Sequence, residues 1–186
     1  MLRVKVEDLK EFTEKQRVRL VQIGKKVEFI FNSPEFEKMF MDANFSGELS
    51  EFKDLDRKKL FDHFMTGAEK LDKVNDQTAN MFIRGYYSFR SVYGYTYGHV
   101  KQFWINVKFI GRSNRSIGGT MAHEWTHKMG AHHDFSPTAR RKNSISYKTG
   151  NIVTELWVKF FEIEAVNRIY KPSKWQRVKS FFRNLF

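Results

Sequence analysis

The sequence predicts a single α+β domain in which a small twisted sheet packs against several helices. Two kinds of stretch predict this class. Some segments repeat apolar residues every three or four positions, as amphipathic helices do, and others are short runs of aromatic and β-branched residues, as strands are. The composition is sufficient for one core, because 41% of the 186 residues are hydrophobic and 16% are aromatic. We therefore expect residues 1–186 to form one domain.

The order of elements follows from the same patterns. Helical spacing of apolar residues is clear over residues 56–75, and Ser33-Pro34-Glu35 is typical of a helix start, with a capping serine and a proline in the first turn. Runs of β-forming residues occur where helical spacing is absent. We expect helices over residues 6–23, 34–42, 56–75 and 151–170, and strands over residues 27–31, 86–93 and 103–110.

The stretch from Gly119 to Asp134 carries the strongest chemical signal. His123 and His127 are four residues apart, so on a helix their imidazoles project in the same direction and can bind one zinc ion. Glu124 follows His123 directly, where a carboxylate can accept a proton from a zinc-activated water molecule. A separate stripe of apolar residues at helical spacing is available to face the core: Ile117, Met121, Trp125 and Met129. We expect this helix to begin after Ser113, Asn114 or Ser116.

A third metal ligand is expected just beyond this helix. Gly130 can end the helix in a left-handed conformation, which would bring His133 back toward the first two histidines. His132 or Asp134 could take that place instead. Three protein ligands leave one position for water, which is typical of a catalytic rather than a structural zinc site.

The pattern H-E-x-x-H-x-x-G-x-x-H-D over residues 123–134 resembles the metzincin branch of the zincin metallopeptidases, in the version seen in adamalysin-like enzymes. More loosely, residues 86–155 resemble small metallopeptidases of bacteria and phages through the segments GYTYG, WIN, HEWTHKMG and SISYKTGNIV. The resemblance implies a zincin-like fold, with an active-site helix across a small sheet, a Zn²⁺ cofactor, and a peptide or protein substrate.

The chain departs from the metzincin pattern downstream of the third histidine. Metzincins have a methionine turn there, whereas the last methionine of this chain is Met129 and the matching stretch, residues 144–147, supplies Tyr147. In some metzincins a nearby tyrosine is a zinc ligand or stabilises the oxyanion, so the resemblance implies either role for Tyr147. It also implies that residues 104–109 form an edge strand that binds extended substrate, with Trp104, Asn106 and Lys108 as candidate contacts; the alternative is that this strand belongs to the core.

Charge is unevenly distributed. The 33 basic and 21 acidic side chains give a formal net charge of +12, and no acidic residue follows Glu164. Residues 173–186 have the pattern of a basic amphipathic helix, which favours an anionic membrane surface as a partner and makes nucleic acid the weaker candidate. The alternatives are that this helix docks on the domain, or that the basic surface has no specific partner.

The sequence has no cysteine, no apolar run long enough to cross a membrane and no secretory signal pattern. This favours the cytoplasm, although a bacterial or viral protein exported by another route would look the same. We expect a zinc-dependent endopeptidase in which His123, His127 and His133 hold the metal and Glu124 is the general base. The alternative functions are a non-catalytic, zinc-stabilised binding protein that acts through its basic surface, and zinc-dependent hydrolysis of a bond other than a peptide bond.

Overall fold

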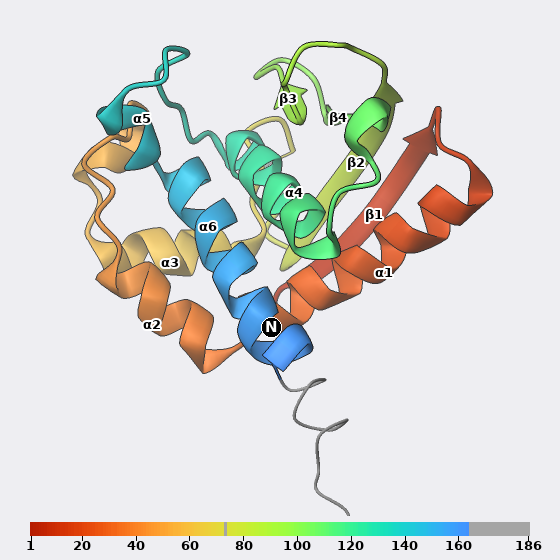
Figure 1. Cartoon of the computed structure of the whole chain (residues 1–186). Helices are drawn as coiled ribbons and strands as arrows, with labels where there is room; N and C mark the ends of the chain where they lie inside the picture. Colours follow the sequence, from red (N-terminus) through yellow and green to blue (C-terminus); the bar gives the residue numbers. More distant parts are fainter. Residues whose placement is uncertain (73, 164–186) are drawn as a thin grey trace, which may run out of the picture.

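The computed structural model describes residues 1–72 and 74–163, and it has the expected α+β fold. Four strands form one open mixed sheet in the order β1-β2-β4-β3 (Figure 1). β1 is parallel to β2 and β2 is parallel to β4, while the short β3 is antiparallel to β4. The strands are β1 (Arg3–Lys10), β2 (Thr78–Tyr86), β3 (Gly94–Thr96) and β4 (Gln102–Asn106).

The helices pack against one face of this sheet and against one another (Figure 1). Along β2 the side chains alternate between buried and half-buried, as expected for a sheet covered on one side. The helices are α1 (Glu14–Phe31), α2 (Pro34–Asp42), α3 (Arg57–Thr66), α4 (Asn114–Met129), α5 (Ala139–Lys142) and α6 (Ile145–Trp157). Short 3₁₀ segments occupy Glu51–Asp54 (η1) and Val107–Phe109 (η2), and a π-helical segment, Val158–Ile163 (η3), follows α6.

The helix predicted over residues 6–23 is confirmed for residues 14–23 but wrong for its start, and the strand predicted over residues 27–31 is wrong. Residues 3–10 form β1 instead of the start of a helix, because Val4 and Val6 alternate with charged residues and face α1, where Gly24 lets Val6 approach. A capping box at Thr13 then starts α1, in which the Thr13 hydroxyl accepts from the Gln16 amide and the Gln16 side chain accepts from the Thr13 amide. The β-rich residues 27–31 are the last turns of α1, since their burial against the core overrides their local preference.

Several other boundaries differ from those predicted. The helix expected over 34–42 is confirmed, whereas the helix expected over 56–75 ends at Thr66 because Gly67 adopts a left-handed φ of 70°. Residues 87–93 form a loop rather than a strand, and the strand expected over 103–110 ends at Asn106, whose side chain caps the following 3₁₀ turn. The last predicted helix begins earlier than expected, at Ile145.

Helix α4 lies in the middle of the molecule, between the sheet and α6 (Figure 1). Two glycines allow α4 and α6 to approach closely: a Cβ atom on Gly150 would lie 2.8 Å from the Gly119 carbonyl oxygen and 3.3 Å from the His123 Cβ. Their close contact brings the first turn of α6 beside the histidines of α4.

A cluster of aromatic rings anchors α4 from the other side. Trp125 is fully buried, and its ring packs edge-on against Phe64 with centroids 5.0 Å apart. Phe31 also contacts Trp125, at 5.9 Å. Since Trp125 lies between His123 and His127 in the sequence, this packing fixes the rotation of the helix that carries them.

The basic segment expected at residues 173–186 lies outside the described residues. Within the part that the structure describes, none of the helices is both long and apolar enough to cross a membrane.

Candidate metal centre

The helix that carries the first two histidines has defined ends. The Ser113 side chain accepts a hydrogen bond from the Ser116 amide and caps the first turn, so Ser113 is the capping residue among the three candidates. At the other end Gly130 has a φ of 117°, and the Ala131 amide donates to the Thr126 carbonyl. The predicted apolar stripe of Ile117, Met121, Trp125 and Met129 is buried.

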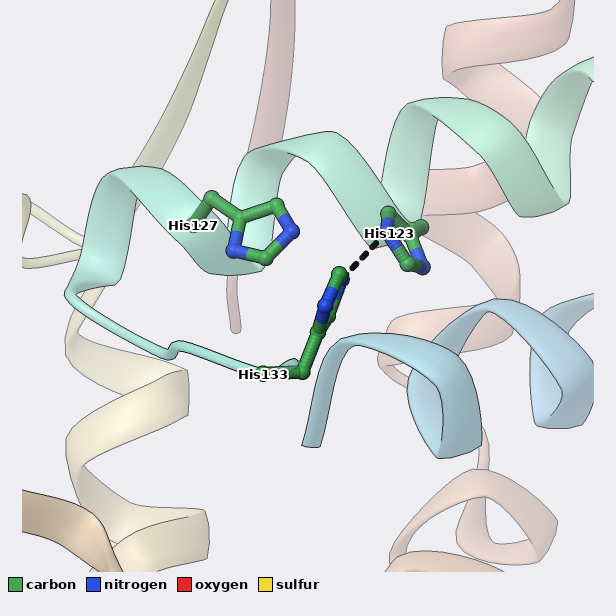
Figure 2. Close-up of side chains that lie close together, drawn as sticks. All are labelled: His123, His127 and His133. Atoms are coloured by element: carbon green, nitrogen blue, oxygen red, sulfur yellow. Dashed lines mark hydrogen bonds between the residues drawn. The ribbon is translucent and has the colours of Figure 1, made fainter. Parts of the chain in front are cut away.

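Three histidines come together at the end of α4. The side chains of His123, His127 and His133 each offer one nitrogen, and these three atoms lie within 4.8 Å of one another. Figure 2 shows the rings facing a common point, with His123 and His127 on the helix and His133 on the segment that follows it. The Nε2 atoms of His123 and His133 are 3.4 Å apart. His133 therefore completes the cluster; its neighbour His132 is exposed.

Hydrogen bonds orient two of these rings. Nδ1 of His127 donates to the Ala131 carbonyl at 2.7 Å, and Nδ1 of His133 donates to the Asp134 carbonyl at 2.8 Å. In each ring the other nitrogen, Nε2, then carries the lone pair that a metal ion requires. Burial lowers the pKa of His127 to about 3, and it also lowers the pKa of His123 and His133. The three imidazoles are thus neutral at physiological pH and could hold a divalent metal ion.

Glu124 lies beside the cluster in a nearly closed environment. Its side chain is only 5% exposed, and burial raises its pKa to about 8. Strand β3 packs directly on it, because a Cβ atom on Gly94 would lie 3.1 Å from the Glu124 Oε1. A carboxyl group in this position can exchange protons near neutral pH.

Tyr147 also lies beside the histidines, in the first turn of α6. Its ring centroid is 4.6 Å from that of His123 and 5.0 Å from that of His133. The guanidinium group of Arg141 lies over the Tyr147 ring at 4.9 Å. Burial raises the pKa of the Tyr147 hydroxyl, so the phenol is protonated and available as a donor.

The segment that carries His133 is held by a residue far away in the sequence. The buried carboxylate of Glu48 accepts from the His132 amide at 2.6 Å and from the Ile145 amide at 3.0 Å. The Leu49 amide also donates to the His132 carbonyl at 3.0 Å. Glu48 therefore ties the third histidine to the start of α6, and with it to Tyr147.

The prediction that residues 104–109 form a substrate-binding edge strand is wrong, because β4 is not at the edge of the sheet. β4 pairs with β2 on one side and with β3 on the other, so its backbone groups are already used, and the free edge next to α4 belongs to β3. The Asn106 amide is buried and donates to the carbonyl oxygens of Ser88 and Val92 at 2.9 and 3.1 Å, which fixes the 87–93 loop.

The side chains of the other two candidate substrate contacts lie in different settings. Trp104 is half-buried and stacks on Tyr95, with ring centroids 5.0 Å apart. Lys108 lies in η2 and its ammonium group is 4.2 Å from the ring centroid of Phe89. Direct contact of these residues with substrate stays a prediction.

A cavity of about 480 Å³ opens beside the histidines, between α4, α6 and the loop before β3. His123, Glu124 and Tyr147 line one part of it, and Arg112 and Arg141 also contribute to its wall. No local sequence pattern points to Glu48 or Arg112, because their roles depend on partners distant in the chain. Arg141 falls in a basic run, Arg140-Arg141-Lys142, which was its only signal.

Comparison of the chain with known protein families, with curated proteins and with solved structures found no match. A function for the chain is therefore inferred from the residues and geometry of the site.

Proposed function

We propose that this protein is a zinc-dependent peptidase of the zincin type. The observation that carries the proposal is a cluster of three neutral histidines bordering a cavity that is also lined by a buried glutamate and a tyrosine. The metzincin-like pattern of residues 123–134 agrees with this assignment, although the methionine of the metzincin turn is absent.

The chemistry of the three donors and the spacing of one pair of them fit zinc. Two nitrogens bound to one tetrahedral zinc ion at 2.0–2.1 Å are about 3.3 Å apart, and the Nε2 atoms of His123 and His133 are 3.4 Å apart. In the absence of a metal ion, one of these two nitrogens can donate a weak hydrogen bond to the other, and a cation bound by both would replace that hydrogen bond. Neutral imidazole is the form that binds zinc.

Each residue of the site then has a defined role. When bound, zinc would polarise the scissile carbonyl group and lower the pKa of a water molecule, so that this water can lose a proton and attack the carbonyl carbon at neutral pH. Glu124 accepts the proton of that water and passes it to the leaving amine, a role suited to a carboxyl whose pKa is raised toward neutrality. The Tyr147 hydroxyl donates a hydrogen bond to the oxygen that gains negative charge.

Two features favour catalysis over a purely structural metal site. A structural zinc site has four protein ligands, whereas the cluster found among the described residues has three histidines. The cavity also reaches His123 and Glu124, so a substrate has access to the site. The free edge of β3 passes Gly94, next to Glu124, and could pair with an extended peptide through backbone hydrogen bonds.

The Glu124→Gln variant tests the proposal. Glutamine has nearly the same shape but cannot accept the proton, so we expect hydrolysis of a denatured protein substrate to fall by at least about 100-fold while zinc content stays at the wild-type value. Glu155→Gln, which changes an exposed residue of α6, is the matched control and should keep the wild-type rate of hydrolysis and the wild-type zinc content. Hydrolysis by Glu124→Gln at the wild-type rate would exclude Glu124 as the general base.

A further inference from the structure

The wall of the cavity beside the histidines is rich in arginine. Arg112 and Arg141 both line it, and Glu124 is the one acidic side chain among its described lining residues. Glu124 is already assigned to proton transfer in the proposed mechanism. Among the described residues, the lining of the cavity thus supplies no other acidic side chain to balance these two positive groups.

Arg112 is held firmly at one part of this wall. Its Nη1 donates to the hydroxyl oxygens of Ser116 and Thr120 at 3.2 and 3.1 Å, and its Nε donates to the Phe109 carbonyl at 3.1 Å. The guanidinium group also lies 4.2 Å from the ring centroid of Tyr93. These contacts fix the plane of the guanidinium before any ligand arrives, which is the arrangement that favours binding of a planar anion.

The hydrogen-bonding capacity of Arg112 is not filled. Its Nη2 has no hydrogen-bond partner within the described residues, but it has almost no accessible surface, so it can donate to a ligand only after a neighbouring side chain moves. Neither Arg112 nor Arg141 takes part in the ion pairs found in that part of the chain. A partly buried guanidinium without an anion is destabilising, and a carboxylate is the group that compensates it best.

The position of Arg112 relative to the metal site determines how far from the cleaved bond a carboxylate bound at Arg112 would lie. Its partners Thr120 and Ser116 precede His123 by one and two turns of α4, which corresponds to about 5 and 10 Å along the helix axis. An extended peptide advances about 3.3–3.6 Å per residue. A carboxylate bound at Arg112 therefore belongs to a residue within about one to three positions of the bond that is cleaved.

We propose that Arg112 forms a carboxylate-binding subsite of this cavity, so that the preferred peptides carry a carboxylate within a few residues of the scissile bond. This inference rests on the proposed peptidase function. The carboxylate has two possible sources, the free C-terminus of the peptide or the side chain of an aspartate or glutamate. The first source corresponds to removal of short C-terminal fragments, and the second to cleavage within a chain beside an acidic residue.

The test uses two matched pairs of peptides with the zinc-loaded protein. One pair differs only in a free or amidated C-terminus within three residues of the cleaved bond, and the other differs only in glutamate or glutamine, placed in turn at each of the three positions on either side of that bond. We expect the carboxylate member of one pair to have a kcat/KM about 10- to 100-fold higher, the range for a charge-assisted hydrogen bond. The pair that shows the preference identifies the source, and equal values in both pairs would overturn the subsite.

Variants of Arg112 link the preference to this residue. Arg112→Gln should bring the two members of the discriminating pair to similar values through a higher KM for the carboxylate peptide. Arg112→Lys keeps the charge without the planar fork, so it should keep an intermediate preference even if the glutamine variant folds poorly. Arg115→Gln is the matched control, because Arg115 lies on α4 but pairs with Glu162 and does not line the cavity. An unchanged preference in Arg112→Lys would contradict the assignment.

A binding measurement separates this inference from the proposed function. The same peptides are titrated by calorimetry into zinc-loaded Glu124→Gln protein, with and without the Arg112→Gln change. Carboxylate-dependent binding that is lost with Arg112, in a protein whose wild-type form cleaves no peptide, would refute the peptidase and keep the subsite. Hydrolysis without any carboxylate preference would refute the subsite and keep the peptidase.

Discussion

At the scale of single residues, the site depends on groups that hold the histidines as much as on the histidines themselves. Backbone carbonyl oxygens of Ala131 and Asp134 accept from two of the rings and so determine which nitrogen faces the common point. Glu48 holds the backbone next to His133 through the His132 amide. The proposed ligand geometry is thus set by a carboxylate that no local sequence pattern connects to the site.

We predict that Glu48→Gln weakens both the fold and the metal site. The glutamine side chain has one acceptor oxygen in place of two, so either the buried Ile145 amide or the His132 and Ser50 amides lose their partner. An unsatisfied buried amide costs about 1–3 kcal/mol in the free energy of unfolding. Denaturant unfolding and a zinc titration against a competing chelator measure the two effects.

The exposed glutamate Glu37 provides the control for this experiment. Glu37→Gln should leave stability and zinc affinity unchanged. If Glu48→Gln matched this control in both measurements, the hydrogen bonds of Glu48 would not be what positions His133.

At the scale of elements, the end of α4 determines where the third histidine lies. Gly130 has a φ of 117°, a value that residues other than glycine rarely adopt. A Cβ atom there would be 3.6 Å from the nearest described atom, in the ring of Phe52, which is ordinary contact distance. The requirement for glycine is therefore conformational and not steric.

We predict that Gly130→Ala lowers stability by about 1–3 kcal/mol through backbone strain and weakens zinc binding by moving His133. Gly98→Ala is the matched control, because a Cβ atom on Gly98 would meet no atom within 4 Å and its φ is outside the left-handed region. Thermal unfolding with and without zinc measures both effects. Equal behaviour of the two variants would show that the turn at Gly130 does not determine the site.

At the scale of the whole molecule, a buried carboxyl group joins the site helix to the sheet. Glu69 is 5% exposed, and its Oε1 accepts from the Trp125 indole at 3.3 Å and from the Asn80 amide of β2 at 3.1 Å. Burial raises its pKa from 4.5 to about 7. Between those two pH values the folded protein keeps a proton that the unfolded chain releases.

This difference predicts how stability depends on pH. Because the pKa of Glu69 is raised in the folded state, its contribution to stability is fully present below about pH 4.5 and is lost as the pH rises toward about 7. The loss is at most about 3 kcal/mol. The metal-site histidines, whose pKa values are lowered, act in the opposite direction, so only the comparison with Glu69→Gln isolates Glu69.

Glu69→Gln keeps an acceptor oxygen and removes the titration. Relative to wild type, the variant should therefore become more stable as the pH rises from 4.5 to 7, as measured by denaturant unfolding at several pH values without zinc. Parallel profiles for the two proteins would contradict the raised pKa of Glu69. The exposed change Glu51→Gln should follow the wild-type profile.

Features encoded by neighbouring residues were predictable from the sequence, and features that depend on distant contacts were not. The α+β class, the helix with its buried stripe, the turn at Gly130 and the clustering of His123, His127 and His133 all follow from spacing along a few turns. The order of strands, the early strand β1 and the helical state of residues 27–31 depend on tertiary packing. Glu48 and Arg112 act through residues that the fold brings together, so no spacing rule identifies them.

The central claim, that the three histidines bind a catalytic zinc ion, is tested most directly by elemental analysis of the purified protein after reconstitution with zinc. The variants to compare with wild type are His133→Ala and His132→Ala, which change neighbouring histidines of which only the first belongs to the cluster. We expect about one zinc ion per chain in wild type and in His132→Ala, and none in His133→Ala. Zinc retained by His133→Ala, or absent from wild type, would contradict the claim.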